Sequence, residues 1–264
     1  MWDTTQYLRF GGERARPFFD LLARVGADKP GFVVDMGCGP GNLTAVLAER
    51  WPSATVVGLD SSAEMIEAAQ ARVLRLNNRA ADAPGLSFMR DDIRHWKPQA
   101  LPDVIISNAV LQWVPEHREV LADWASWLPD EGWLAVQVPG NFDQPSHVLM
   151  HELVQAARWR PFLKDVNLTR KSADPADYAG LLAQAGCEVD AWETTYLHIL
   201  QGADPVLEWI KGTGLRPVLA VLDAEQAADF LAEYGERLRK AYPPQPFGTV
   251  FPFRRIFAVA HRAN

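Results

Sequence analysis

Short apolar runs alternate with amphipathic stretches through the first half of the chain. The runs are rich in β-branched residues and lack polar alternation, which is typical of parallel strands buried on both faces. The stretches between them carry apolar residues at helical spacing, so the alternation predicts an α/β fold with a doubly wound, mostly parallel sheet. The expected strands are 32–36, 55–59, 86–90, 103–107 and 133–138, and the expected helices are 13–25, 42–50, 63–76 and 115–128.

The regular alternation of strands and helices ends after residue 139. Two further strands, near 188–200 and 250–261, complete a seven-stranded sheet of Rossmann-like type. The segments 145–185 and 202–245 are mainly helical in pattern and do not fit the alternation, so we expect them to form a lid over the open end of the sheet. The predicted single domain spans residues 1–264, with its core at about 30–140 plus the two late strands.

A glycine-rich turn follows the first strand and opens the next helix. Gly37, Gly39 and Gly41 lack side chains, so the backbone can turn tightly there and a ligand can approach it. Ligands of open parallel sheets bind beyond the carboxyl ends of the strands. Asp60 ends the second strand, where a carboxylate can accept both hydroxyls of a ribose. The alternative is a tight strand–helix turn that binds nothing.

The details of the turn favour S-adenosylmethionine over a dinucleotide. The glycines run G-x-G-x-G, whereas the dinucleotide pattern is G-x-G-x-x-G. Pro40 has no N–H group for a pyrophosphate. Asp35 precedes the glycines, where a carboxylate would repel phosphates but would suit the ammonium group of a methionine moiety.

Other strand ends add candidates for the same ligand. We expect Asp92 to hold an adenine amino group while Ile93 packs the ring, Met65 to pack adenine, and Asn108 to line the methionine end. Each has a structural alternative: a solvated loop charge at Asp92, a core methionine at Met65 and a turn-forming residue at Asn108. The predicted cofactor-binding residues are Asp35, Gly37, Gly39, Gly41, Asp60, Ser61, Met65, Asp92, Ile93 and Asn108.

The turn from Asp35 to Gly41, together with Asp60 and Asp92, resembles that of the class I S-adenosylmethionine-dependent methyltransferases. Over nearly the whole chain the sequence is similar to the family of trans-aconitate methyltransferases. The segments around 77–82 and 243–247 are less typical of that family. The closer similarity rests on residues 7–10, 13–17, 111–113, 134–139, 147–150, 185–190, 194–196, 213–217 and 253–255.

This resemblance implies transfer of a methyl group from S-adenosyl-L-methionine to one carboxylate of trans-aconitate, with S-adenosyl-L-homocysteine as the second product. It implies no metal. A carboxylate is already ionised at neutral pH, so no general base is needed and no catalytic side chain is predicted. Positioning and exclusion of water would supply the rate. Residues 108–111 also lack the Asn-Pro-Pro-aromatic motif that is typical of enzymes methylating base or amide nitrogens.

A tricarboxylate needs groups that hold its other carboxylates, and arginine does this with a bidentate fork. Arg254 and Arg255 alternate along one strand, so at least one of them must face away from the site. The charged candidates could instead be solvated, and Trp113 and His147 could belong to the core. The predicted substrate-binding residues are Arg14, Trp113, His147, Tyr196, Arg216, Arg254 and Arg255.

Net charge and composition limit the classes of partner that we expect for this protein. The 264 residues carry a formal net charge of −7, which argues against a nucleic acid partner, and no apolar run is long enough to span a membrane. Two cysteines, Cys38 and Cys187, make no disulfide framework, so we expect a cytoplasmic protein. The oligomeric state stays open, with a monomer favoured. Two alternatives remain: a methyltransferase for another small or carrier-bound acid, and a non-catalytic S-adenosylmethionine-binding protein.

Overall fold

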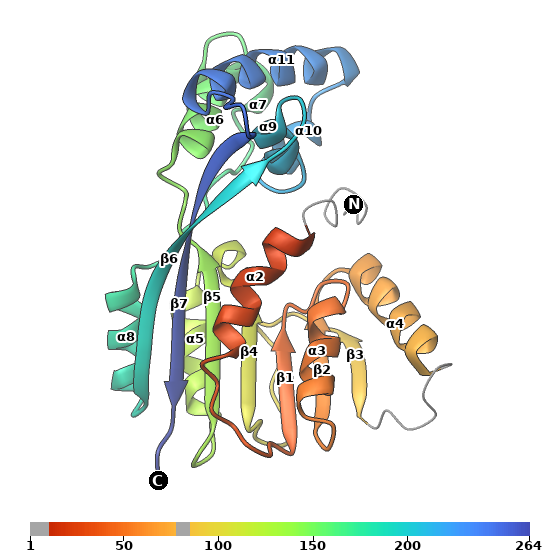
Figure 1. Cartoon of the computed structure of the whole chain (residues 1–264), viewed down its shortest axis with the longest axis vertical. Coiled ribbons are helices and arrows are strands. Elements are labelled where there is room, and N and C mark those ends of the chain that lie inside the picture. Colours follow the sequence, from red (N-terminus) through yellow and green to blue (C-terminus); the bar gives the residue numbers. More distant parts are fainter. Residues whose placement is uncertain (1–10, 78–84) are drawn as a thin grey trace.

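The computed structural model describes residues 11–77 and 85–264. One seven-stranded sheet runs through it in the order β3-β2-β1-β4-β5-β7-β6 (Figure 1). Only the strand that closes the chain is antiparallel to its neighbours. The predicted doubly wound, mostly parallel sheet is therefore confirmed. The strands are β1 (Phe32–Met36), β2 (Thr55–Asp60), β3 (Leu86–Arg90), β4 (Val104–Asn108), β5 (Trp133–Pro139), β6 (Glu188–Leu200) and β7 (Thr249–His261).

Helices cover both faces of the sheet. Three lie on one face, namely α2 (Gly11–Leu22), α3 (Asn42–Arg50) and α4 (Ala63–Asn77), whereas α5 (His117–Ser126) lies on the other (Figure 1). The two faces of strand β1 are covered by different helices. Val33 belongs to the apolar cluster that includes α2 and α3, and Val34 to the cluster that includes α5. Such burial on both sides explains the continuous apolar runs in the sequence.

The helix α8 (Pro175–Gln184) corrects one expected boundary. The sequence placed it in a lid segment at 145–185, but it packs against β6, β7 and α5 on the sheet. Tyr178 and Leu182 are buried there in the same apolar cluster as α5. Because its apolar face fits the sheet, the first lid segment ends before residue 175. Asp174 and Asp177 form a capping box that starts the helix.

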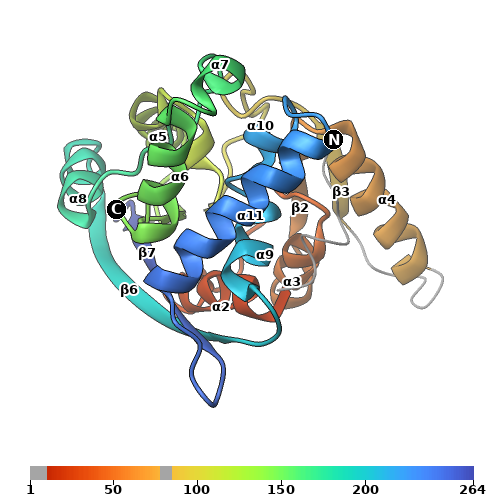
Figure 2. The same cartoon turned by 90° about the horizontal axis from the view of Figure 1, so that it is seen from above.

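The remaining helices form a lid above the carboxyl ends of the strands (Figures 1 and 2). They share an apolar core with the far ends of β6 and β7, around the fully buried Trp159, Trp209, Phe230 and Phe251. No helix in the described ranges is long and apolar enough to cross a membrane. The lid helices are α6 (Pro145–Gln155), α7 (Arg160–Leu163), α9 (Pro205–Lys211), α10 (Arg216–Leu219) and α11 (Ala224–Ala241).

Because α8 packs on the sheet, shortening a buried side chain of this helix should lower the stability of the protein. Leu182 is fully buried, so Leu182→Ala should lower the free energy of unfolding by about 2–5 kcal/mol, measured by urea denaturation. Gln184 is exposed on the same helix, and Gln184→Ala should change it by less than about 0.5 kcal/mol. Equal, small effects of the two substitutions would show that α8 is not part of the core.

Candidate functional site

The three glycines of the turn after β1 all have left-handed backbone conformations. Their φ angles are 81°, 55° and 72° at Gly37, Gly39 and Gly41. A Cβ at Gly37 would collide with Val110, and one at Gly41 would lie 2.5 Å from the ring of Phe88. A Cβ at Gly39 would meet no atom within 4 Å. Two glycines therefore allow close packing, whereas Gly39 leaves open space beside its backbone where a ligand can lie.

Asp60 stands beside this turn at the end of β2. One carboxylate oxygen accepts a hydrogen bond from the Gly39 N–H at 2.9 Å, and the other accepts one from the Ser62 N–H at 2.9 Å. These bonds fix the carboxylate against the turn. Because a carboxylate offers about four acceptor positions, it can still bind ligand hydroxyls.

Asp35 lies beneath the turn, where it is only 3% exposed. Its carboxylate accepts a hydrogen bond from the Thr44 hydroxyl at 2.6 Å, which ties β1 to α3. Burial raises the pKa of Asp35 to about 6, although the Thr44 bond opposes the shift. Asp35 is therefore enclosed beneath the turn, and its expected contact with a ligand ammonium group stays a prediction.

The other predicted cofactor residues gather at the ends of β2, β3 and β4. Met65 and Ile93 are buried, whereas Ser61 is exposed. Asp92 accepts hydrogen bonds from the backbone and guanidinium of Arg94, which lower the pKa of Asp92 to about 2 and keep it ionised. Asn108 ends β4, and its buried Oδ1 has no hydrogen-bond partner in the protein.

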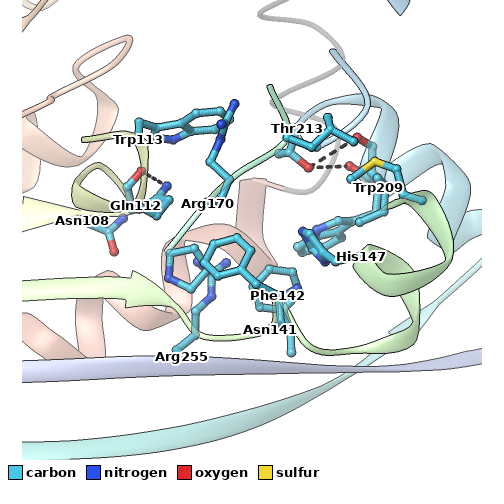
Figure 3. A pocket seen from close by; sticks show the side chains of 17 residues that line it. Asn108, Gln112, Trp113, Asn141, Phe142, His147, Arg170, Trp209, Thr213 and Arg255 are labelled. Atoms are coloured by element: carbon cyan, nitrogen blue, oxygen red, sulfur yellow. Dashed lines mark hydrogen bonds between the residues drawn. The ribbon is translucent and has the colours of Figure 1, made fainter. Parts of the chain in front are cut away.

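A pocket lies between the ends of β4 and β5, the middle of β7 and the lid (Figure 3). The structure places four predicted residues in its wall: Asn108, Trp113, His147 and Arg255. It adjoins the glycine turn, because Ala109 lines the pocket and the next residue packs on Gly37. The other lining residues are Gln112, Pro139, Asn141, Phe142, Met150, Leu168, Arg170, Trp209, Ile210, Thr213, Gly214 and Phe253.

Three residues predicted to bind substrate do not line this pocket. Arg254 faces away from it and pairs with Asp174 and Glu193, as strand alternation requires when Arg255 points inward. The Tyr196 hydroxyl instead donates a hydrogen bond to Asp20 on α2.

Arg216 begins α10 but is not among the described residues that line the pocket. Burial lowers its pKa, and the nearby Glu64 carboxylate on α4 partly offsets this shift. The side chain of Arg14 lies outside the described residues.

Several amides in and beside the pocket were not singled out from the sequence. Asn141 is 1% exposed, and neither its Oδ1 nor its Nδ2 has a hydrogen-bond partner in the protein. Gln112 leaves its Oε1 unbonded, and so does Gln137, which pairs in register with Asn108. The strand-end rule could have found Asn141, which follows β5. Because an unbonded buried polar group is costly, these amides point to a polar ligand.

Arg170 was also missed, because it lies on irregular chain between α7 and α8 where periodicity gives no signal. Its guanidinium lies 4.2 Å from the centre of the Trp113 ring. Arg170 and Arg255 both line the pocket, and none of the described lining residues is acidic. Burial lowers the pKa of His147 to about 4, so this histidine is neutral at physiological pH. The pocket is thus positively charged and suits an anion.

Metal binding finds no support in this region. No group of three or more histidine, cysteine, aspartate or glutamate residues within 11–77 and 85–264 is arranged to hold a metal ion.

Comparisons with known proteins agree with this geometry. Residues 10–191 match the family described as "Methyltransferase domain". The solved YcgJ protein of Bacillus subtilis shares the fold with a TM-score of 0.59 at 12% identity, covering 94% of this chain and 99% of that one. Phosphoethanolamine N-methyltransferase 2 of Haemonchus contortus, solved with S-adenosyl-L-methionine, gives a TM-score of 0.57 at 14% identity, covering 94% and 53%.

Curated relatives are far more similar. The trans-aconitate 2-methyltransferase of Rhodococcus jostii is 54% identical over 263 residues, which is 98% of this chain and 99% of that protein. The protein of the same name from Streptomyces avermitilis is 54% identical over 265 residues, covering 99% and 97%. The chain therefore belongs to the methyltransferase family and, within it, to the trans-aconitate 2-methyltransferases.

Proposed function

We propose that this protein transfers the methyl group of S-adenosylmethionine to a carboxylate of trans-aconitate, forming a monomethyl ester and S-adenosylhomocysteine. The observation that carries the proposal is the pocket beside the glycine turn, which presents two arginines and no acidic side chain among its described residues. Such a pocket fits a polycarboxylate. The names of the relatives, which are similar over their whole length, support the same acceptor.

The residues around the turn fit S-adenosylmethionine. Asp60 would accept the ribose hydroxyls, and the open space at Gly39 would admit the ligand beside the backbone. Asp92 would share its carboxylate between Arg94 and the adenine amino group, beside Ile93. The unbonded Oδ1 of Asn108 would accept a hydrogen bond from the methionine ammonium. Asp35 would support the turn from below.

The chain's own residues would act by holding the acceptor and excluding water. The cofactor, when bound, supplies an electrophilic methyl group on a positively charged sulfur. Attack by a carboxylate disperses charge, and water stabilises the separated ions more than the transition state. The lid covers the site with aromatic side chains such as Phe142 and Trp209, which would keep it dry. Arg255 would hold a carboxylate of the acid, while the neutral His147 adds no charge.

This mechanism predicts a flat pH profile at neutral and alkaline pH. The acceptor needs no base, and the pKa of His147 is about 4, so kcat/KM for trans-aconitate should stay constant from pH 7 to 9. It should fall below about pH 6, as Asp35 takes up a proton beneath the turn and then the acid itself protonates. A steady rise of kcat/KM between pH 7 and 9 would indicate a general base and contradict the mechanism.

Asp60 provides a test of the cofactor site. Asp60→Ala removes a charged acceptor and should weaken S-adenosylmethionine binding by about 1–3 kcal/mol, measured by titration calorimetry. The exposed Glu67 on α4 supplies the control, because Glu67→Gln removes a carboxylate outside the turn and should leave binding unchanged. An unaltered dissociation constant in the Asp60 variant would refute its assignment to the ribose.

The direct test of the proposed activity is an acceptor panel. The pure protein is incubated with S-adenosylmethionine and trans-aconitate, cis-aconitate, isocitrate, citrate or itaconate, and methyl esters and S-adenosylhomocysteine are quantified by mass spectrometry. We expect the highest turnover with trans-aconitate. Higher turnover with another acid would move the assignment to that acceptor. Cofactor binding without any ester would point to a carrier-bound acid or a non-catalytic role.

A further inference from the structure

Arg170 occupies an unusual position among the residues of the pocket. It projects from the irregular chain that joins the lid to α8, whereas Arg255 comes from β7 on another side of the same space (Figure 3). Its guanidinium carbon lies 4.2 Å from the centre of the Trp113 ring, and its Nη1 donates a hydrogen bond to the Thr169 carbonyl at 2.7 Å. These contacts hold the side chain at the pocket wall.

The charge of Arg170 is not matched within the described part of the chain. Within the described residues its guanidinium donates a hydrogen bond to a neutral carbonyl, and no carboxylate there forms an ion pair with it. Arg170 is half-buried, and this partial burial lowers the pKa of its guanidinium. Other arginines are instead neutralised by aspartate or glutamate; these are Arg24, Arg94, Arg158, Arg237, Arg239 and Arg254.

We propose that Arg170 determines the specificity of the enzyme for polycarboxylates, by binding a carboxylate other than the one that is methylated. This inference rests on the proposed methyl transfer to trans-aconitate. The guanidinium carbon lies 4.2 Å from the centre of the Trp113 ring, and Nη1 donates a hydrogen bond to Thr169. The remaining N–H groups would form two parallel hydrogen bonds with a carboxylate. Arg170 and Arg255 would then hold different carboxylates of one acid.

Discrimination between acids follows from the cost of leaving a half-buried charge unpaired when a ligand fills the pocket. An acid that lacks the additional carboxylate would occupy the pocket and leave the half-buried Arg170 guanidinium unpaired, whereas a tricarboxylate would neutralise it. Arg170 therefore affects mainly the relative reactivity of acids with different numbers of carboxylates. A side chain that merely shaped the pocket would affect all acids to a similar degree.

The test compares trans-aconitate with itaconate, a dicarboxylate, as acceptors for the wild type and for Arg170→Gln. We expect KM for trans-aconitate to rise about tenfold or more with kcat within threefold, so that the ratio of the two kcat/KM values falls about tenfold. Arg170→Lys keeps the charge without the planar fork and should give an intermediate ratio. The exposed Arg160 on α7 is the matched control, since Arg160→Gln should leave the ratio unchanged.

A ratio that stays constant while both acids react more slowly would overturn the assignment, because it would show a structural role only. If the wild type methylates no acid of the panel, the proposed function fails separately. The inference is then tested by calorimetric titration of trans-aconitate into the protein saturated with S-adenosylhomocysteine. Binding that Arg170→Gln weakens about tenfold supports it, whereas absent binding, or equal binding by both proteins, overturns it.

Discussion

The site depends on the antiparallel pairing of β6 and β7. Both strands have 13 residues and pair along their whole length, whereas β5 pairs with β7 only as far as the register Pro139–Arg255. Beyond that point the two strands leave the sheet and enter the apolar core of the lid. A continuous ladder of backbone hydrogen bonds therefore fixes the lid relative to the sheet, and Arg255 lies where the ladder crosses from one to the other.

The charge of the pocket differs in sign from the net charge of the whole chain. The chain as a whole is acidic, with a net charge of −7, yet its pocket carries arginines and no acidic side chain among the described lining residues. Salt screens exposed charges beyond about 8 Å, so the overall charge does little to repel an anion that has entered a partly buried pocket. Arg254 and Arg255 point to opposite sides of β7, so that Arg254 pairs with Asp174 and Glu193 while Arg255 lines the pocket.

The sequence predicted the sheet because buried parallel strands and amphipathic helices have distinct periodicities. It also located the glycine turn, Asp60 and Asn108, since strand ends converge at one edge of such a sheet. It misplaced α8, because periodicity reports that a helix has an apolar face but not which surface covers that face. Arg170 lay beyond prediction for a related reason: an arginine on irregular chain gives no local signal, and only the folded lid brings it onto Trp113.

The unbonded amides beside the pocket affect both the stability of the fold and the binding of a ligand. Asn141 and Gln137 are almost wholly buried without hydrogen-bond partners in the protein, an arrangement that lowers the stability of the fold by itself. Ala109, next to Asn108, also has a left-handed backbone conformation, with φ of 59°, that costs a residue other than glycine some energy. Unfavourable groups of this kind remain in a folded protein where the surrounding packing holds them in place. A polar ligand that satisfies the amides would recover part of this energy on binding, so these amides would favour polar acids over apolar molecules of the same size.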